Sequence, residues 1–261
     1  MARLPKRTFD WAPSFDPKSR NYAISEKIRS TPRRVDTIWD IGPILDQGSE
    51  GACVGFGWTA QTLASPFKSD LNKSKSLKSP REPEPFALHV YKEAQKVDKW
   101  PGEEYSGTSV LAGAKTMKTL GFVTAYAWAF NVDDIVNSII AKGPVVLGIP
   151  WHSGMYKAPG GVLKVSGKKV GGHCIVAVGF KASSQKFGGK SSIILQNSWG
   201  EDWGVEGLAE IEVSELEKLM SSGGEACIPL NTAYRQPSLL RRFVINIKSS
   251  CSTAFKRVSG F

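Results

Sequence analysis

Residues 45–58, LDQGSEGACVGFGW, place one cysteine directly after a Gly–Ala pair and at the start of an apolar run of helix length. From Ala52 onward the apolar residues recur at helical spacing, so the stretch predicts a helix that is buried on most sides. Ser49 is the expected N-cap residue of this helix. Cys53 then lies in its first turn, where the positive end of the helix dipole lowers the pKa of a thiol. A lone buried cysteine is more often a packing residue, so its role depends on what else the chain supplies.

The chain around this stretch divides into a helical half and a β-rich half. Further helices are predicted at 85–97 and 108–121, and a short one at 131–144. After that the pattern changes to short β-branched and apolar runs, which predict strands at 145–149, 161–165, 173–180, 191–199 and 207–213. We therefore expect an α+β fold whose two halves pack as lobes with a groove between them.

The charge of the chain is concentrated at its two ends. Of 261 residues with a net charge of +10, residues 1–34 hold nine Lys and Arg against three acids, and residues 235–261 hold six against none. The body between them is slightly acidic, which excludes a basic nucleic-acid-binding surface there. The basic ends either bind nucleic acid or an anionic surface, or are solvated tails that keep the protein soluble.

Composition and cysteine spacing exclude several other classes. The sequence is 41% hydrophobic with eight Trp, enough for a substantial core. No apolar run approaches the roughly 20 residues that span a bilayer, and the first residues lack the apolar block of a signal peptide. The four cysteines form no CxxC pair, which argues against a disulfide framework or zinc site and favours a reducing compartment.

Four separate stretches supply the groups that nucleophilic cysteine catalysis requires. The nucleophile is Cys53, and Gln47 stands six residues earlier, where its amide can donate to an oxyanion. His173 begins a predicted strand behind two glycines, so its ring can face a groove as an acid and base. Asn197 can fix the tautomer of that imidazole.

Three blocks of the sequence resemble a known family. DQGSEGACVGF, GGHCIVAVG and NSWGEDWGVEG resemble, in this order, the Cys, His and Asn blocks of the papain-like (C1) cysteine peptidases. The resemblance covers about residues 35–230. It implies a helical left lobe (35–128) and an antiparallel β-barrel right lobe (129–234), with the cleft between them. The basic N-terminal arm (1–34) and a basic C-terminal segment (235–261) flank this core.

The resemblance also assigns roles to individual residues. It makes Gln47 the oxyanion donor, Cys53 the nucleophile, His173 the general base and acid, and Asn197 the residue that orients the imidazole. Trp199 would shield the His–Asn hydrogen bond. The expected substrate-binding residues are Gly51, Ala52, Tyr105, Ser106, Gly107, Thr108, Trp151 and Gly172. For the two aromatic residues among them a core role is equally open.

The function that follows is a cysteine endopeptidase acting through a thioester acyl-enzyme on peptide or protein substrates, with no metal or organic cofactor. Two alternatives remain open. One is an amidase or acyltransferase that uses the same chemistry on cell-wall peptides or other acyl groups. The other is a non-catalytic scaffold that keeps the fold and uses its basic ends to bind a partner. We expect a monomer.

Some positions depart from the pattern of the family. Glu50 stands where secreted relatives carry a disulfide cysteine, Val54 replaces a tryptophan, and Gly172 precedes the histidine. The first departure points to an intracellular enzyme in the cytoplasm, or in the virion if a phage encodes the protein. The missing disulfides and the missing prodomain resemble bacterial or bacteriophage members. The 34-residue arm is too short for the family's helical prodomain, and we expect that it occupies the cleft instead.

Overall fold

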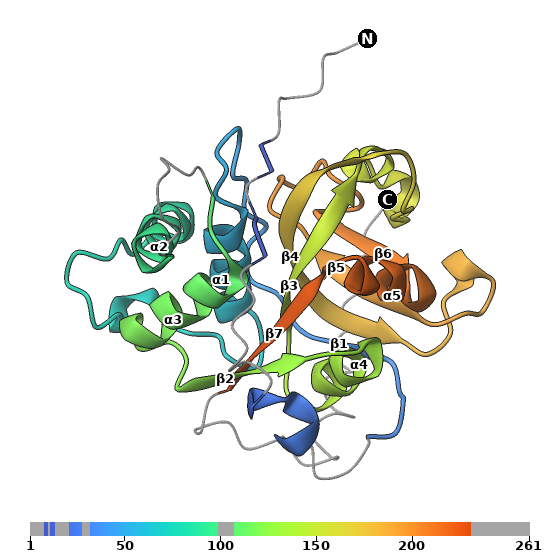
Figure 1. Cartoon of the computed structure of the whole chain (residues 1–261), viewed down its shortest axis with the longest axis horizontal. Coiled ribbons are helices and arrows are strands. Elements are labelled where there is room, and N and C mark those ends of the chain that lie inside the picture. Colours follow the sequence, from blue (N-terminus) through green and yellow to red (C-terminus); the bar gives the residue numbers. More distant parts are fainter. Residues whose placement is uncertain (1–7, 10, 14–20, 28–31, 99–106, 231–261) are drawn as a thin grey trace, which may run out of the picture. The chain divides into compact units, whose positions relative to one another are not determined.

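The computed structural model describes residues 8–9, 11–13, 21–27, 32–98 and 107–230, all within one structural unit that spans residues 1–231. The basic C-terminal segment lies outside the described residues. Within this unit α1, α2 and α3 gather on one side of an antiparallel sheet, and α4 and α5 lie on the other side (Figure 1). The α+β fold class expected from the sequence is confirmed.

The helices are α1 (Cys53–Leu63), α2 (Pro83–Val97), α3 (Val110–Leu120), α4 (Val132–Ala141) and α5 (Val213–Ser221). The strands are β1 (Thr37–Ile38), β2 (Ala125–Ala129), β3 (Val145–His152), β4 (Lys169–Lys181), β5 (Ser192–Gln196), β6 (Leu208–Glu212) and β7 (Glu225–Leu230). Short 3-10 turns occupy Ile24–Lys27, Leu71–Lys73, Ser153–Tyr156, Pro159–Gly161 and Gln185–Phe187. The strand order is β2-β7-β3-β4-β5-β6, and β1 pairs with β4.

The expected helices are present, and most of the expected strands are too. The segment 161–165 differs, because Val162 makes only an isolated bridge to Glu210 and the residues before it form a 3-10 turn. The elements β1, β2, α5 and β7 were not predicted from the sequence. Alanines dilute the β signal of β2 (AYAWA), and β7 contains a proline, which is uncommon within a sheet.

Two glycines explain how α1 becomes the buried centre of the helical side. A Cβ atom at Gly55 would lie 2.2 Å from the carbonyl oxygen of Ala87 in α2. At Gly57 it would lie 2.8 Å from Sγ of Cys174 in β4. The helix therefore packs backbone-close against α2 on one side and the sheet on another.

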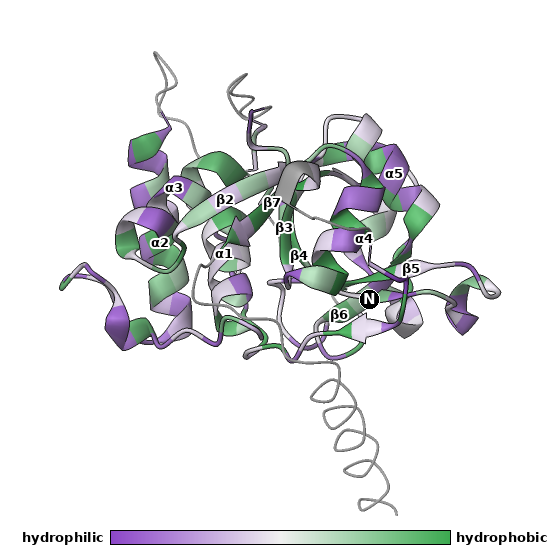
Figure 2. Cartoon of the chain, turned by 90° about the horizontal axis from the view of Figure 1, so that it is seen from below, coloured by the Kyte–Doolittle hydropathy of each residue, from purple (hydrophilic) through white to green (hydrophobic). Residues whose placement is uncertain are grey.

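Alternating residues of the central strands pack into two different clusters, as the pleat of a sheet requires. Val146, Cys174 and Cys227 face α1–α3 and share a cluster with Cys53 and Trp58. Their neighbours face α4 and α5 in a larger cluster, which includes Leu147, Ile175, Ala226, Ile139 and Leu216. Figure 2 shows the hydrophobic residues of the strands between the two helical layers.

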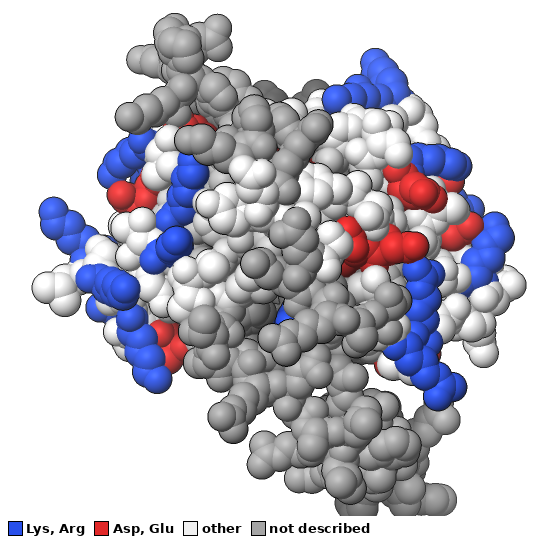
Figure 3. All heavy atoms as spheres, turned by 60° about the horizontal axis from the view of Figure 1, so that its bottom comes forward, with Lys and Arg blue, Asp and Glu red and all other residues white. Residues whose placement is uncertain are grey.

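The described surface carries charges of both signs. On the face shown in Figure 3, Lys and Arg side chains are interspersed with Asp and Glu rather than forming a single-sign patch. This agrees with the balanced charge of the body of the sequence. No helix in the described part of the chain is long and apolar enough to cross a membrane.

Candidate active site

Cys53 is the first residue of α1, and its side chain has no exposed surface. The N-cap is Ala52, which makes no side-chain cap, so the expectation that Ser49 caps the helix was wrong. Instead the loop before the helix is shaped by an Asx turn, in which Gly48 N–H donates to Asp46 Oδ1 at 2.9 Å. The thiol thus lies at the positive end of α1, in the first turn as the apolar pattern predicted.

The imidazole of His173 lies on β4, opposite Ile149 of β3, and is fully buried. Its Nε2 is 2.8 Å from Oδ1 of Asn197, which also accepts the backbone N–H of Ser198 at 2.8 Å. An amide oxygen accepts only, so Nε2 carries the proton in this contact. The ring is thereby held in one tautomer, with Nδ1 at its other edge.

Two tryptophans enclose this imidazole. The ring centroids of Trp199 and His173 are 4.8 Å apart, and those of Trp151 and His173 are 4.7 Å apart. The two indoles also contact each other, with centroids 5.2 Å apart. Trp151 is fully buried, so it packs beside the histidine rather than presenting an open surface. The His173–Asn197 hydrogen bond consequently lies in an apolar setting that excludes water.

Gln47 is held in a fixed orientation by Ser198, a residue that the sequence analysis did not single out. Ser198 Oγ donates to Gln47 Oε1 at 2.7 Å, and the Gln47 backbone N–H donates to the Ser198 carbonyl at 2.9 Å. Because Oε1 accepts this bond, Nε2 is the end of the amide that donates, and one of its protons goes to the Glu50 carbonyl at 2.7 Å. A primary amide has a second N–H, which is the one available for an oxyanion.

The segment that precedes α3 forms a second wall of the site, opposite the strand that carries His173. Tyr105 and Ser106 lie outside the described residues, whereas Gly107 and Thr108 are both buried. Asp98, at the end of α2, anchors this wall by accepting the Thr108 hydroxyl and both the N–H and, at 2.9 Å, the hydroxyl of Ser109. The wall is therefore tied to α2, although 99–106 between them are not described.

The described residues of the N-terminal arm between 8 and 13, which we name the covering segment, cross this site. The Trp11 backbone N–H donates to the Gly172 carbonyl at 3.2 Å. One residue later, the Ala12 N–H donates to the Thr108 carbonyl at 3.3 Å. The segment thus joins the wall before α3 to the strand that carries His173, as an added strand joins a sheet edge.

The aromatic side chain of Phe9 lies directly against the catalytic candidates. Its ring centroid is 6.1 Å from that of His173 and 5.8 Å from that of Trp199. On the other side of the site, the Thr8 hydroxyl donates to the Ser49 carbonyl in the loop before Cys53 at 2.7 Å. The covering segment therefore contacts both sides of the candidate active site.

The two glycines before His173 make room for this segment. A Cβ at Gly171 would lie 2.5 Å from that of Phe9, and a Cβ at Gly172 would lie 2.3 Å from the indole of Trp11. The sequence correctly predicted that these positions leave space before the histidine. It did not predict that Trp11, only 6% exposed, fills part of that space.

The other described thiols differ from Cys53 in their surroundings. Burial raises the pKa of both Cys174 and Cys227 well above the ordinary value for a thiol. Neither is in a disulfide, and neither is at a helix start. Among the described residues, no group of three or more His, Cys, Asp or Glu is placed to hold a metal ion.

Comparison with known proteins gives a consistent family assignment. A family model described as papain family cysteine protease matches residues 87–223, which include His173 and Asn197 and begin after Cys53. A gut-specific cysteine proteinase of Caenorhabditis elegans is 37% identical over 90 residues, which are 34% of this chain and 26% of that protein. The chain thus spans only about a quarter of this relative.

One relative matches over a longer stretch, and solved structures match in fold. An uncharacterized peptidase C1-like protein of Acanthamoeba polyphaga mimivirus is 22% identical over 248 residues, covering 74% of each chain. Xylellain, a cysteine protease from Xylella fastidiosa, is 15% identical with a TM-score of 0.59, covering 89% of this chain and 99% of that one. Procathepsin L 3 from the Tenebrio molitor larval midgut is 14% identical with a TM-score of 0.57, covering 87% and 75%.

Proposed function

This chain belongs to the papain family of cysteine proteases, and we propose that it hydrolyses peptide bonds with Cys53 as the nucleophile and His173 as the general base and acid. The observation that carries the proposal is the 2.8 Å contact between His173 Nε2 and Asn197 Oδ1. It fixes the proton on the nitrogen remote from the nucleophile. The other nitrogen, Nδ1, is then the one that exchanges a proton with Cys53 and the substrate.

The reaction proceeds in two balanced steps. The Cys53 thiolate forms a bond to the peptide carbonyl carbon, the C–N bond breaks, and the imidazolium of His173 gives its proton to the leaving amine. Water then gives a proton to His173 and attacks the thioester, and the carbon–sulfur bond breaks to restore the thiolate. The start of α1 stabilises that thiolate, and Asn197 keeps the imidazolium oriented in both steps.

Gln47 is the proposed oxyanion donor, together with the backbone N–H of Cys53. Ser198 supports this role. Its hydroxyl takes no part in the chemistry, but its hydrogen bond holds Gln47 Oε1 away from the developing negative charge. A preorganised amide donor costs no reorientation during the reaction. Trp199 is proposed to keep water from the His173–Asn197 bond.

The same geometry supports a substrate path along the two walls. We assign backbone contacts with substrate to Gly172 and Thr108, whose carbonyls already accept N–H groups from the covering segment. Gly107 belongs to the same wall, and Gly51 and Ala52 flank the nucleophile without bulky side chains. Trp151 shapes this region by packing against His173.

In the full chain the covering segment is proposed to compete with substrate. It occupies the backbone acceptors of Gly172 and Thr108 and places Phe9 beside His173. Within the family, we propose a relationship to bacterial and viral members. The relatives include a mimivirus protein, and the described cysteines form no disulfide.

The test is peptide hydrolysis by the full chain and by a full-length Phe9→Ala/Trp11→Ala variant. We expect cleavage of unfolded protein substrates that is lost in Cys53→Ala and retained in Cys227→Ala, the matched control at a buried thiol. Iodoacetamide should also alkylate Cys53 below pH 7, where Cys227 stays unreactive. Cleavage of cell-wall peptides but not of casein would favour the amidase alternative. A Cys53 that iodoacetamide alkylates neither in the full chain nor in the Phe9→Ala/Trp11→Ala variant would favour a scaffold.

A further inference from the structure

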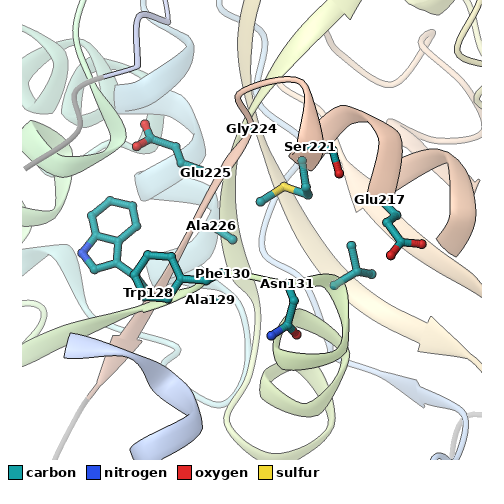
Figure 4. A pocket seen from close by; sticks show the side chains of 11 residues that line it. Trp128, Ala129, Phe130, Asn131, Glu217, Ser221, Gly224, Glu225 and Ala226 are labelled. Carbon is teal, nitrogen blue, oxygen red and sulfur yellow. The ribbon is translucent and has the colours of Figure 1, made fainter. Parts of the chain in front are cut away.

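A cavity of about 270 Å³ lies between the residues that follow β2 and the second half of α5 (Figure 4). Phe130 and Val132 line it on the β2 side, and Glu217, Met220 and Ser221 line it on the α5 side. None of the described residues that line it belongs to the proposed catalytic set or to the covering segment. Drug-sized ligands fill about 300–1,000 Å³, so a cavity of this size suits a single side chain.

Most of the wall of this cavity is apolar. Val132 and Ala226 are buried, and Met220 packs against the larger apolar cluster of the sheet. Phe130, which directly follows β2, is different because 50% of its surface is exposed. A large aromatic side chain that is left half in water beside a cavity is stabilised by a ligand that covers it. The cavity therefore suits a ligand with an apolar stem.

Glu217 brings a negative charge to this cavity. The acidic residues before it in the chain are paired, Glu212 with Lys190 at 3.0 Å and Glu215 with Lys218. Within the described ranges Glu217 has neither a hydrogen bond nor an ion pair. Lys, Arg and His are also missing from the described residues that line the cavity. A cationic ligand would therefore meet a carboxylate that is not already paired with a neighbour.

The end of α5 favours a cation in the same place. The last two residues of this helix line the cavity, and the C-terminal end of a helix dipole attracts positive charge. Glu225 of β7 also borders the cavity, but its Oε1 accepts the indole N–H of Trp11 at 2.8 Å, in the space that Gly148 leaves opposite it on β3. The side chains of Glu225 and Glu217 lie on opposite sides of the β7 strand (Figure 4). Glu217 is thus the acid that a ligand in the cavity can meet.

We propose that this cavity binds the arginine side chain of a polypeptide, with the guanidinium group at Glu217 and the aliphatic stem along Val132 and Met220. The inference goes beyond the proposed function and does not depend on peptide hydrolysis. An arginine side chain has an apolar stem that ends in a cation, which matches an apolar wall with one acid. A guanidinium group is less strongly hydrated than an ammonium group and can bind a carboxylate in a bidentate manner, so arginine is favoured over lysine.

The experiment follows the Met220 methyl group by NMR in full-length protein that carries carbon-13 in its methionine methyl groups. The chain has four methionines, so the spectrum is simple, and Met220→Leu identifies the signal. Met117 and Met155 are fully buried and serve as internal references. The probe is acetyl-glycyl-arginyl-glycine amide, and the control peptide has citrulline, which is similar in shape but uncharged. We expect a saturable shift of the Met220 signal, with about 5-fold tighter binding of the arginine peptide, the upper factor for an exposed ion pair.

Matched variants separate the charge of the cavity from its apolar wall. Glu217→Gln keeps the size of the side chain and should weaken the arginine peptide about 5-fold, to the affinity of the citrulline peptide. Glu215→Gln removes an acid of the same helix that is paired with Lys218, and it should leave both affinities unchanged. Phe130→Ala should weaken both peptides alike, by about 2-fold, because it removes apolar contact and no charge. Added salt should weaken only the arginine peptide.

Three results would overturn the inference. These are a Met220 signal that does not move, equal binding of the arginine and citrulline peptides, and a Glu217→Gln variant that binds the arginine peptide as tightly as wild type. Shifts of similar size in the two buried methionines would also count against the cavity, because they would indicate a change throughout the core. Failure of the proposed function has a different signature, in which no peptide is cleaved and iodoacetamide labels Cys53 no faster than Cys227.

Discussion

The imidazole of His173 is contacted by aromatic side chains from two regions with different relations to the fold. Trp199 comes from the block after β5, with its ring centroid 4.8 Å away, and Phe9 comes from the covering segment, with its centroid 6.1 Å away. Trp199 is 3% exposed and Phe9 is only partly buried. Similar contacts with the His173 ring should therefore have opposite consequences, since the Trp199 region is proposed to orient the base and the covering segment is proposed to obstruct it.

The two regions also differ in how their backbones are held. The Asn197 N–H donates to the Gly207 carbonyl at 3.0 Å, and the Gly200 N–H donates to the Leu45 carbonyl at 3.1 Å, so the Trp199 block is tied between two loops of the core. The covering segment is held instead by the Trp11 indole, by the 2.7 Å bond from the Thr8 hydroxyl to Ser49, and by two longer backbone bonds of 3.2 and 3.3 Å. A peptide that displaces the covering segment would therefore replace these contacts with contacts of the same kind.

The largest effect is expected from Asn197→Ala, which removes the acceptor that fixes the His173 ring. We expect kcat to fall about 100-fold or more with a smaller change in KM, because the loss acts on proton transfer rather than on binding. Steady-state kinetics of the full chain measure this. The matched control is Asn131→Ala, which removes the N-cap of α4 and should lower stability by about 1 kcal/mol without lowering kcat. An unchanged kcat in Asn197→Ala would break the comparison.

Replacing both aromatic residues of the covering segment should have the opposite sign. In full-length Phe9→Ala/Trp11→Ala protein we expect kcat/KM to rise about 10-fold, because a larger fraction of molecules has an open site. The same variant should unfold at a lower temperature, since it loses buried aromatic contacts. Tyr22→Ala is the control, because this arm residue is 54% exposed. A fall in turnover with the double variant would show that the segment supports the site.

Deleting residues 1–33 would be a poorer test than these substitutions. Ile24 is fully buried in the cluster that includes Val132 and Leu147, so part of the arm belongs to the core. Trp11 is also buried, and these described residues are therefore not a solvated tail. The deletion would remove core packing together with the obstruction, and its effect on turnover would combine both.

The sequence predicted the two regions unequally, for physical reasons. The Cys, His and Asn blocks depend on residue identities in a fixed order, so Gln47, Cys53, His173 and Asn197 could be named as candidates without coordinates. The arm was expected at the cleft from its position before the core. Which of its residues lie there was not predicted, because the arm has no periodicity and these contacts are long-range ones with Gly171 and Gly172. Glu225 is likewise invisible in sequence, because only the β3–β7 register brings it opposite Gly148.

Ser198 marks an intermediate case. It stands between two residues that the sequence analysis named, yet its contact with Gln47 spans 151 positions of the chain. Similarly, the apolar spacing predicted the helix at Cys53 but placed its cap three residues too early. Local patterns define elements and motif blocks, whereas the positioning of one block by another depends on tertiary packing.

A smaller effect is expected from Ser198→Ala, which sharpens the comparison within the Trp199 block. Losing the hydrogen bond to Gln47 Oε1 frees the amide to rotate, and a neutral hydrogen bond contributes about 1 kcal/mol. We therefore expect kcat to fall about 5-fold, with the pH profile unchanged. Ser198→Thr keeps the hydroxyl and should restore most of the activity. A loss as large as that of Asn197→Ala would mean that Ser198 acts on His173 instead.

The smallest effect concerns the pH dependence of the covering segment, through Glu225. Glu225 Oε1 accepts the indole N–H of Trp11 at 2.8 Å. Burial raises the pKa of Glu225 from its ordinary 4.5 to about 7 and outweighs the opposing hydrogen bond from Trp11, so the carboxyl group favours its neutral form while the segment is docked. When the segment leaves, water reaches the carboxyl group, and its pKa falls toward the ordinary value. By linkage, docking is strongest at low pH and weakens as pH rises through about 7.

The measured quantity is the kcat/KM of wild type divided by that of Phe9→Ala/Trp11→Ala, which cancels the titration of the catalytic pair itself. We expect this ratio to rise about 3-fold between pH 5 and 8, because one partly solvated group supplies only part of its full linkage. In a Glu225→Gln background the ratio should stay flat. The neighbouring thiols Cys174 and Cys227 have pKa values far above this range, but Asp98 also acts on Glu225. If the ratio still rises with pH in the Glu225→Gln background, the pH dependence belongs to Asp98 or another group. The docking of Trp11 would then not depend on the titration of Glu225.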